Sequence, residues 1–131
     1  MSEVLIKTIE LSNGLKLDFY DISRKLAGDR WYVGVIARID IPLIDSLLTN
    51  QRLSHYSVEE IRNTLGESVH FQQKRERHYI DEREKDHLLN SLMDSFIKRT
   101  LNYFSHPDFP GIYVLKEFQT CRKRKTWYQN D

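Results

Sequence analysis

Hydrophobic and polar residues alternate over much of the first forty positions, which is the pattern of β-strands that bury one face. Two alternating runs, 4–11 and 15–20, flank a Ser-Asn-Gly sequence and predict a β-hairpin. A three-residue loop, 12–14, sets Leu17 opposite Ile9 and keeps one face of the hairpin apolar, whereas a two-residue loop mixes apolar with polar residues. We therefore expect the three-residue loop, with its glycine in the left-handed conformation.

The alternation is clearest from Trp31 to Ile41, where every second residue is apolar until Pro42 ends the run. This run predicts a third strand, so that the first forty residues form an antiparallel meander. The second connection of the meander is 21–30, a segment that holds two aspartates, three cations, a serine and a glycine.

Signals for helices and for one further strand follow. Residues 43–48 suit a short helical turn, and the Ser-Val-Glu-Glu sequence at 57–60 is a capping box that starts a helix. That helix should stop near Leu65, with Gly66 supplying the left-handed residue at its end. Over 69–80 the pattern is extended and strongly charged, which predicts an edge strand whose charges discourage pairing with other sheets.

A long amphipathic helix is predicted over 82–104, where apolar residues recur at three- and four-residue intervals. Acidic residues at 81–84 mark its start. The apolar spacing over 112–121 favours a helix over a strand. These elements predict an α+β fold, in which an antiparallel sheet of about four strands packs against the long helix and one or two shorter helices. The sheet would consist of the three-strand meander and the edge strand.

Length and charge limit the classes of function. The 131 residues contain no linker rich in proline or glycine, so we expect one domain, 1–131, that ends in a basic and aromatic segment, 122–131. The 20 basic and 19 acidic residues give a net charge of +1, which draws the chain neither to nucleic acids nor to membranes. Any such binding would require a local patch.

Cys121 is the single cysteine, which excludes an internal disulfide and fits a reducing compartment. No apolar run approaches the length of about 18 to 20 residues that a bilayer span requires. The N-terminus lacks the basic region and apolar stretch of a secretory signal. We therefore expect a cytoplasmic protein that has no membrane contact.

The segment 21–30 is the first candidate for a ligand site, because binding groups concentrate on connections that a rigid sheet holds in place. Arg24 and Arg30 could bind a phosphate or a carboxylate, since guanidinium groups match these oxyanions. Asp21 and Asp29 would then orient the two arginines.

A structural role for the same segment is the alternative. Asp21 and Ser23 are turn-forming residues whose side chains bond nearby backbone, and the arginines would simply pair with the aspartates. The sequence does not decide between a ligand site that includes Ser23 and a turn that it stabilises.

The second candidate is a nucleic-acid interface. Near the C-terminus four consecutive cations precede two aromatic residues, which could contact phosphates and stack on bases. Two arginines on one face of the predicted edge strand would extend this surface if they lay beside it. The residues concerned are Arg75, Arg77, Arg122, Lys123, Arg124, Lys125, Trp127 and Tyr128. A solvated charged surface is the alternative, because the chain has no wider basic face.

No metal or cofactor is expected, because the five histidines are scattered and Cys121 has no cysteine or histidine at zinc-ligand spacing. Nucleophile, phosphate-binding and dinucleotide motifs are also missing. The leading hypothesis is a non-enzymatic binding module for an unknown protein or a small anionic ligand at 21–30. Nucleic-acid binding is the alternative, and a small enzyme that uses the same segment is the third. A second copy could also pair with the edge strand 69–80 to form a homodimer.

Overall fold

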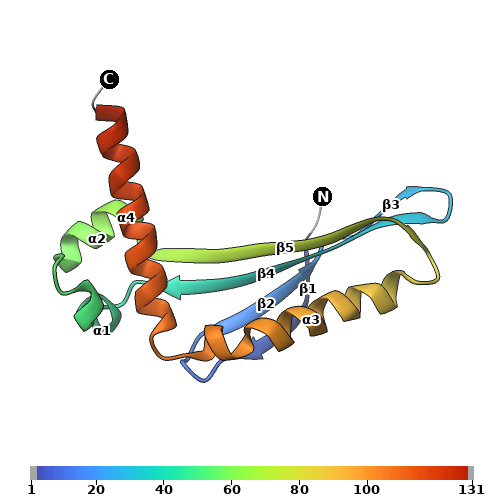
Figure 1. The fold of residues 1–131 in the computed structure, drawn as a ribbon, viewed down its shortest axis with the longest axis horizontal. Coiled ribbons are helices and arrows are strands. Elements are labelled where there is room, and N and C mark those ends of the chain that lie inside the picture. The colour runs from blue at the N-terminus through green and yellow to red at the C-terminus, as the bar shows by residue number, and fades with distance from the viewer. Residues whose placement is uncertain (1–2, 130–131) are drawn as a thin grey trace. The chain divides into compact units, whose positions relative to one another are not determined.

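The structure, a computed structural model, describes residues 3–129, with the backbone alone for 125–129 (Figure 1). Its α+β fold confirms the expected class, although the antiparallel sheet has five strands rather than about four. In chain order the elements are β1 (Val4–Glu10), β2 (Lys16–Asp21), β3 (Arg24–Ala27), β4 (Arg30–Pro42), α1 (Asp45–Leu48), a 3₁₀ turn (Gln51–Leu53), α2 (Val58–Leu65), β5 (Ser68–Asp81), α3 (Lys85–Ser105) and α4 (Phe109–Gln129).

The chain divides into two compact units. The first, which we call the sheet unit, comprises Met1–Ile39 and Phe71–Ser105, and the second, the helical unit, comprises Asp40–His70 and His106–Asp131. Each unit buries apolar side chains of its own. The expectation of a single domain over 1–131 stays a prediction.

The expected register of the first hairpin is confirmed. Ile9 pairs with Leu17, and the Leu11 amide donates to the Leu15 carbonyl at 2.8 Å, so the loop has three residues. Gly14 has a φ of 91°, the left-handed conformation that the bulged turn requires.

The segment 21–30 is not the open connection that the charge pattern predicts. The short strand β3 lies within it and pairs with the first residues of β4, while β2 pairs with residues farther along β4. Ala27 pairs with Arg30, so Gly28 and Asp29 form a two-residue turn in which Gly28 has a φ of 56°. The hairpin has charged side chains and no alternating apolar face, so the sequence pattern does not predict it.

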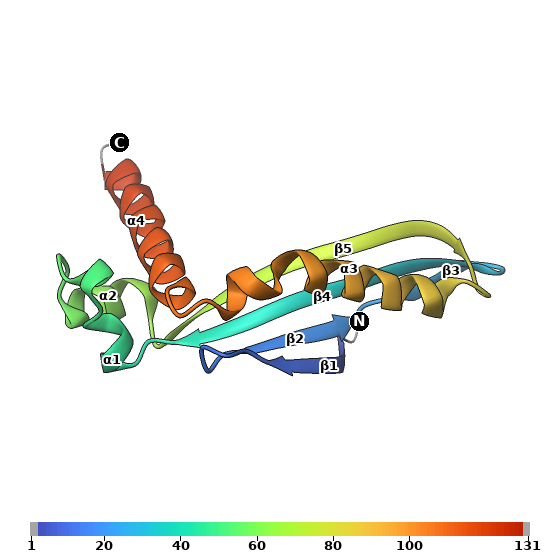
Figure 2. The same cartoon turned by 60° about the horizontal axis from the view of Figure 1, so that its bottom comes forward.

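The helix α3 runs along one face of the sheet (Figure 2). Phe96 meets Phe19 edge to face, with ring centroids 5.8 Å apart, and Leu17, Phe19 and Ile39 have no exposed surface. The expected long helix is therefore the main cover of the sheet, but it begins at Lys85 rather than at 82. The first residues of the expected helix form a turn instead, because the Asp81 carboxylate accepts from the Arg83 amide at 2.9 Å.

The helical unit confirms the expected capping signals. The Ser57 hydroxyl accepts from the Glu60 amide at 3.0 Å at the start of α2, and Gly66 ends that helix with a φ of 87°. The helix expected over 112–121 is also confirmed, and α4 continues through Gln129. None of the described helices is both long and apolar enough to cross a membrane.

Candidate functional site

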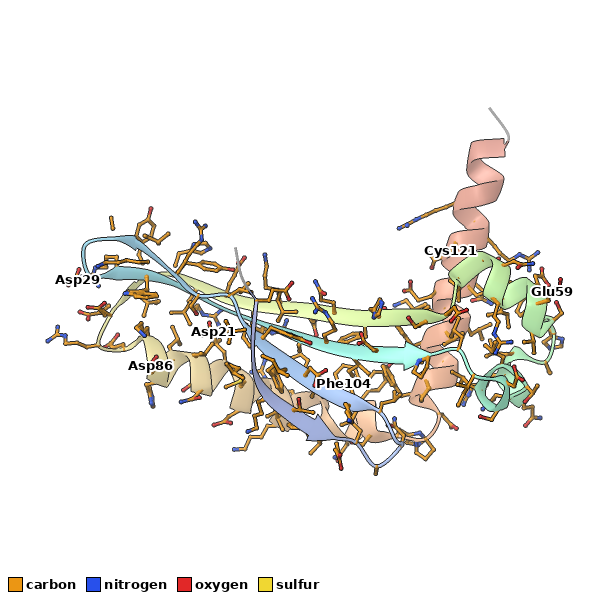
Figure 3. The ribbon with its side chains drawn as sticks, turned by 180° about the vertical axis from the view of Figure 1, so that it is seen from behind. Asp21, Asp29, Glu59, Asp86, Phe104 and Cys121 are labelled. Atoms are coloured by element: carbon orange, nitrogen blue, oxygen red, sulfur yellow. The ribbon has the colours of Figure 1, made fainter. Side chains whose placement is uncertain are left out.

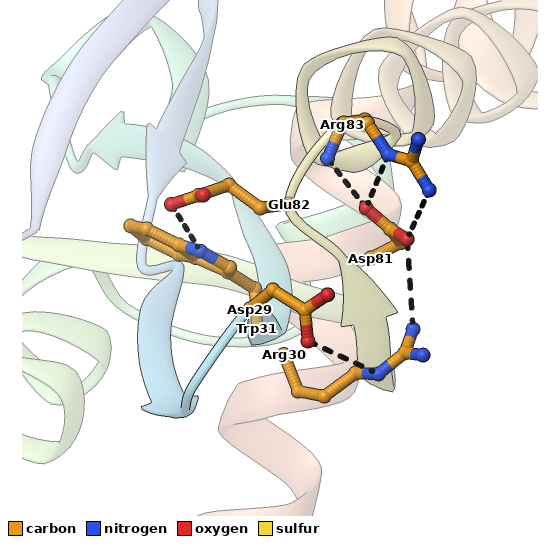
Figure 4. Close-up of polar contacts among 6 residues, drawn as sticks. All are labelled: Asp29, Arg30, Trp31, Asp81, Glu82 and Arg83. Atoms are coloured by element: carbon orange, nitrogen blue, oxygen red, sulfur yellow. Dashed lines mark hydrogen bonds and ion pairs between the residues drawn. The ribbon is translucent and has the colours of Figure 1, made fainter.

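The tip of the β3–β4 hairpin is bonded to the turn between β5 and α3. The Glu82 amide donates to the Asp29 carbonyl at 2.8 Å. The Trp31 indole donates to the Glu82 carboxylate at 3.2 Å (Figure 4). The Lys85 ammonium lies 4.7 Å from the centre of the Trp31 ring. We call this group the tip cluster, and its residues are Asp29, Arg30, Trp31, Asp81, Glu82, Arg83 and Lys85.

Within the tip cluster, Arg30 is neutralised by two carboxylates. Its guanidinium lies 3.7 Å from Asp29 and 4.0 Å from Asp81. Asp81 is also bonded by the Arg83 side chain and amide, and these hydrogen bonds lower the pKa of the Asp81 carboxyl to about 2. Asp81 is therefore ionised at neutral pH, and an anion that approached Arg30 would have to compete with two carboxylates.

The two aspartates of the predicted site do not lie together. Figure 3 shows Asp29 at the turn of the hairpin and Asp21 farther along, where β2 ends. The Asp21 carboxylate accepts from the Ser23 amide at 2.8 Å, and the Ser23 hydroxyl accepts from the Gly34 amide at 3.2 Å. Both side chains thus satisfy backbone groups where β2 gives way to β3, as the structural alternative predicts.

Arg24 has different surroundings from Arg30. It pairs with Tyr32 across the hairpin, and its guanidinium lies 5.3 Å from the centre of the Tyr32 ring. Within the part of the chain that the structure describes, no carboxylate forms an ion pair with Arg24. Arg24 is thus an exposed cation that stacks on an aromatic ring.

Tyr32 is the fixed centre of this second group of residues. Its side chain is only 6% exposed, its hydroxyl donates to the Glu76 carboxylate, and the His78 ring packs against it with centroids 5.1 Å apart. Burial and this hydrogen bond raise the pKa of Tyr32 to about 12, and the same bond lowers the pKa of Glu76. We call Arg24, Tyr32, Glu76 and His78 the sheet-face cluster.

Gly34 makes room for the Tyr32 ring. A Cβ atom at position 34 would lie 2.7 Å from the Tyr32 hydroxyl oxygen and 2.9 Å from the Cγ1 atom of Ile22. The ring can therefore lie over the strand only because residue 34 is a glycine. The sheet-face cluster depends on this close approach.

Arg38, in the same sheet, is an arginine that both stacks on a tyrosine and forms an ion pair with a carboxylate. Its guanidinium lies 4.7 Å from the centre of the Tyr20 ring, but it also bonds the carboxylate of Glu3 at 2.9 Å and the side-chain oxygen of Gln72. Stacking on a tyrosine therefore does not by itself leave an arginine available. Among the described residues, Arg24 differs from Arg38 because no carboxylate forms an ion pair with it.

The arginines of β5 lie along their own strand. The Arg75 guanidinium donates to the Lys74 carbonyl at 3.2 Å and lies 5.5 Å from the centre of the Phe96 ring. The Arg77 guanidinium donates to the Glu76 carbonyl at 2.7 Å. Both side chains thus bond backbone oxygens of an edge strand and cover part of that edge.

The basic segment near the C-terminus continues the helix α4. Arg122 packs on the rings of Tyr56 and Phe118, at 5.4 and 5.6 Å from their centres, while Lys123 and Arg124 are exposed. Consecutive helix residues point in different directions, so these cations spread around α4 instead of lining one face. The side chains of Lys125, Trp127 and Tyr128 lie outside the described residues. Arg75 and Arg77 belong to the sheet unit, whereas Arg122 and Arg124 belong to the helical unit, and a groove that joins them stays a prediction.

Sequence reasoning missed Tyr32, Glu76 and His78 as members of a candidate site. A usable signal was the glycine two positions after a tyrosine in an otherwise apolar strand, because residues at this spacing share a face. The partners on β5 carried no signal. Among the described residues, no three side chains of the metal-ligating types gather closely enough to hold a metal ion.

Comparison with protein families, with curated proteins and with solved structures finds no match to this chain. The geometry of its own residues is therefore the basis for assigning a function.

Proposed function

We propose that this chain is a non-enzymatic cytoplasmic binding module that contacts its partner through the β3–β4 hairpin. In this proposal Arg24 binds an anionic group, either on a partner protein or on a small ligand. The observation that carries the proposal is the stacked Arg24 side chain, which has no carboxylate partner among the described residues. The single Cys121 fits the reducing compartment.

Stacking favours the use of Arg24 as a contact. A guanidinium over an aromatic face is held in one plane and is only weakly hydrated, while its N–H donors stay at its edge for a carboxylate or a phosphate. Arg30 lacks this freedom because Asp29 and Asp81 already lie beside it. Of the two arginines predicted as anion contacts, we therefore assign that role to Arg24.

The pKa values of the titratable groups also favour a binding function over acid–base catalysis. A general acid or base works best when its pKa lies near the operating pH. Among the described residues, the groups with clearly displaced pKa values all move away from neutrality. The pKa is raised for Tyr32, Arg83 and Tyr113 and lowered for Glu76 and Asp81. The displaced groups thus suit stable polar contacts rather than proton transfer.

A thermal-shift screen against nucleotides, sugar phosphates, small dicarboxylates and oligonucleotides tests the proposal. A ligand at about 100 times its dissociation constant adds about 2.7 kcal/mol to the free energy of unfolding. For a chain of this size the midpoint should rise by on the order of 5 °C. We expect an anion to give such a shift with the wild-type chain.

Two variants locate the bound anion. Arg24→Ala should remove the shift, whereas Lys25→Ala removes an equal charge from the next residue and should keep it. A shift that survives Arg24→Ala, or a screen without any shift, would overturn the assignment of Arg24. A shift by oligonucleotides that is lost when Lys123 and Arg124 become alanine would instead support the nucleic-acid alternative.

A further inference from the structure

Among the described strands, β1, β3 and β5 each pair with a single neighbour, and β3 is only four residues long, two of them cations. The two long edges, β1 and β5, differ. Within the part of the chain that is described, β1 pairs with β2 and β5 pairs with β4. An edge strand presents backbone groups that can bond a strand of another chain. Each edge is therefore a candidate for self-association, and its side chains decide whether pairing is favourable.

The side chains of β5 discourage this strand from pairing with a strand of another chain. The guanidinium groups of Arg75 and Arg77 already bond backbone carbonyls of this strand. Antiparallel pairing of two β5 strands about a two-fold axis at Lys74, Arg75 or Glu76 would also set two like charges against each other. The strand that the sequence pattern suggests for a homodimer is therefore poorly suited to pairing with itself.

The edge of β1 has no charged side chain over Val4, Leu5 and Ile6, although a bulge lies between Leu5 and Lys7. Val4, Leu5 and Ile6 are 54%, 53% and 39% exposed, which makes them the longest run of consecutive exposed large apolar side chains among the described residues. Consecutive apolar residues on an open edge are a recognised site of strand addition. The contrast with β5 points to β1 as the edge that another strand covers.

A second copy of this chain matches the β1 edge. When two β1 strands pair antiparallel about a two-fold axis at Leu5, Leu5 meets its own equivalent and Val4 meets Ile6 of the second copy. The same register sets Glu3 opposite the second copy's Lys7, so no like charges face each other. Apolar residues thus meet apolar residues on both strands.

We propose that the chain forms a two-fold homodimer by antiparallel pairing of β1 with β1 of a second copy, centred on Leu5. The bulge between Leu5 and Lys7 limits the length of this pairing. The buried area is accordingly small, and the dimer is weak and depends on concentration. The proposal does not depend on the ligand contact of Arg24.

Sedimentation velocity over a range of concentrations tests the dimer. The average mass should rise from 15.7 kDa toward twice that value as the concentration of the wild-type chain increases. Leu5→Lys places two like charges at the two-fold axis and should keep the chain monomeric. Ile44→Lys is the matched control, because Ile44 is also 53% exposed but lies before α1, and it should dimerise like the wild type.

A mixing experiment tests the register. Leu5→Lys and Leu5→Glu should each be monomeric, whereas an equimolar mixture should form a heterodimer because opposite charges then meet at the axis. Circular dichroism and the midpoint of unfolding should show that all three variants are folded. A wild-type chain of constant mass at every concentration, a dimer that tolerates Leu5→Lys, or a mixture that stays monomeric would overturn the proposal.

Discussion

Arg24 and Arg30 lie on the two strands of one hairpin but have opposite electrostatic surroundings. Arg30 lies beside the carboxylates of Asp29 and Asp81, and Arg24 stacks on the Tyr32 ring without a carboxylate partner in the described chain. Residue type and position in a hairpin therefore do not by themselves make a cation available for binding. Availability depends on what a distant segment places beside the cation, and here Asp81, at the end of β5, lies beside Arg30.

The largest effect is expected from Gly34→Ala, which disrupts the Arg24 side of the comparison. The new Cβ atom would meet the Tyr32 hydroxyl and Ile22 at under 3.0 Å, so the Tyr32 ring must leave its position over the strand. Such overpacking costs about 1 to 3 kcal/mol, and the hydrogen bond to Glu76 is lost as well. Urea denaturation should give a free energy of unfolding that is lower by about 3 kcal/mol.

Gly111→Ala is the control for Gly34→Ala. A Cβ atom at position 111 meets nothing closer than 3.8 Å, and the residue lies in α4. Alanine is a better helix former, so this variant should be unchanged or more stable by about 0.5 to 1 kcal/mol. Equal stability of Gly34→Ala and the wild type would show that Tyr32 does not rely on the glycine.

A smaller effect is expected from Tyr32→Phe, which keeps the ring under Arg24 but removes the hydroxyl. The lost hydrogen bond to Glu76 should lower the free energy of unfolding by about 1 kcal/mol at neutral pH. Because folding raises the pKa of Tyr32 to about 12, its contribution is complete below pH 10 and disappears as the pH rises through 12. The loss of stability over this alkaline range should be smaller in the variant.

Tyr32→Phe also tests whether the tyrosine hydroxyl contributes to anion binding by Arg24. If the aromatic face alone orders Arg24, then any anion that shifts the wild-type midpoint should shift the midpoint of the variant equally. Loss of the shift would show that the hydroxyl and Glu76 also position the guanidinium. Denaturation between neutral pH and pH 12 gives the stability, and the thermal-shift assay gives the binding.

Much of the fold follows from local patterns. The hairpin register follows because a one-residue slip would turn Leu17 and Ile9 to the solvent, and Ser57 marks the start of α2 because its hydroxyl satisfies a free amide. The short strand β3 has no such signal. Its residues are mostly exposed, so no apolar alternation distinguishes a paired strand from a charged loop.

The candidate site was only partly predictable for a related reason. The sequence identifies Arg24 and Arg30 as candidate anion contacts, but the groups that separate them come from β5. Tyr32 and Glu76 are 44 residues apart in the chain, and Arg30 and Asp81 are farther apart still. Composition and spacing contain no information on such pairs, because the register between β4 and β5 has to be known first.

The acid titration of Asp81 tests the ion pairing of Arg30. Hydrogen bonds from Arg83 hold the pKa of Asp81 at about 2, below its ordinary value of 3.8. Because folding lowers this pKa, the carboxylate stabilises the folded chain above pH 3.8, and the contribution is lost as the pH falls toward 2. Asp81→Asn should be less stable than the wild type at neutral pH, and the difference should shrink over this acidic range.

Urea denaturation at neutral pH and at a pH between the two pKa values measures the effect of Asp81→Asn. Asp86→Asn is a suitable control, since Asp86 is an exposed carboxylate in the first turn of α3 and the pairing of Arg30 does not involve it. A difference for Asp81→Asn that is the same at both pH values would show that the Arg83 contact does not depend on the carboxylate charge.

The smallest change in stability is expected from Arg24→Ala, and it completes the comparison. An exposed cation–π contact contributes about 0.5 to 1 kcal/mol, so this variant should unfold almost as the wild type does while losing the anion-induced thermal shift. Arg30→Ala should show the reverse, with binding retained and stability lowered, because Asp29 and Asp81 would lose a shared cation. If both variants lose stability and binding together, the hairpin acts as one unit, and the electrostatic difference between the two arginines has no functional meaning.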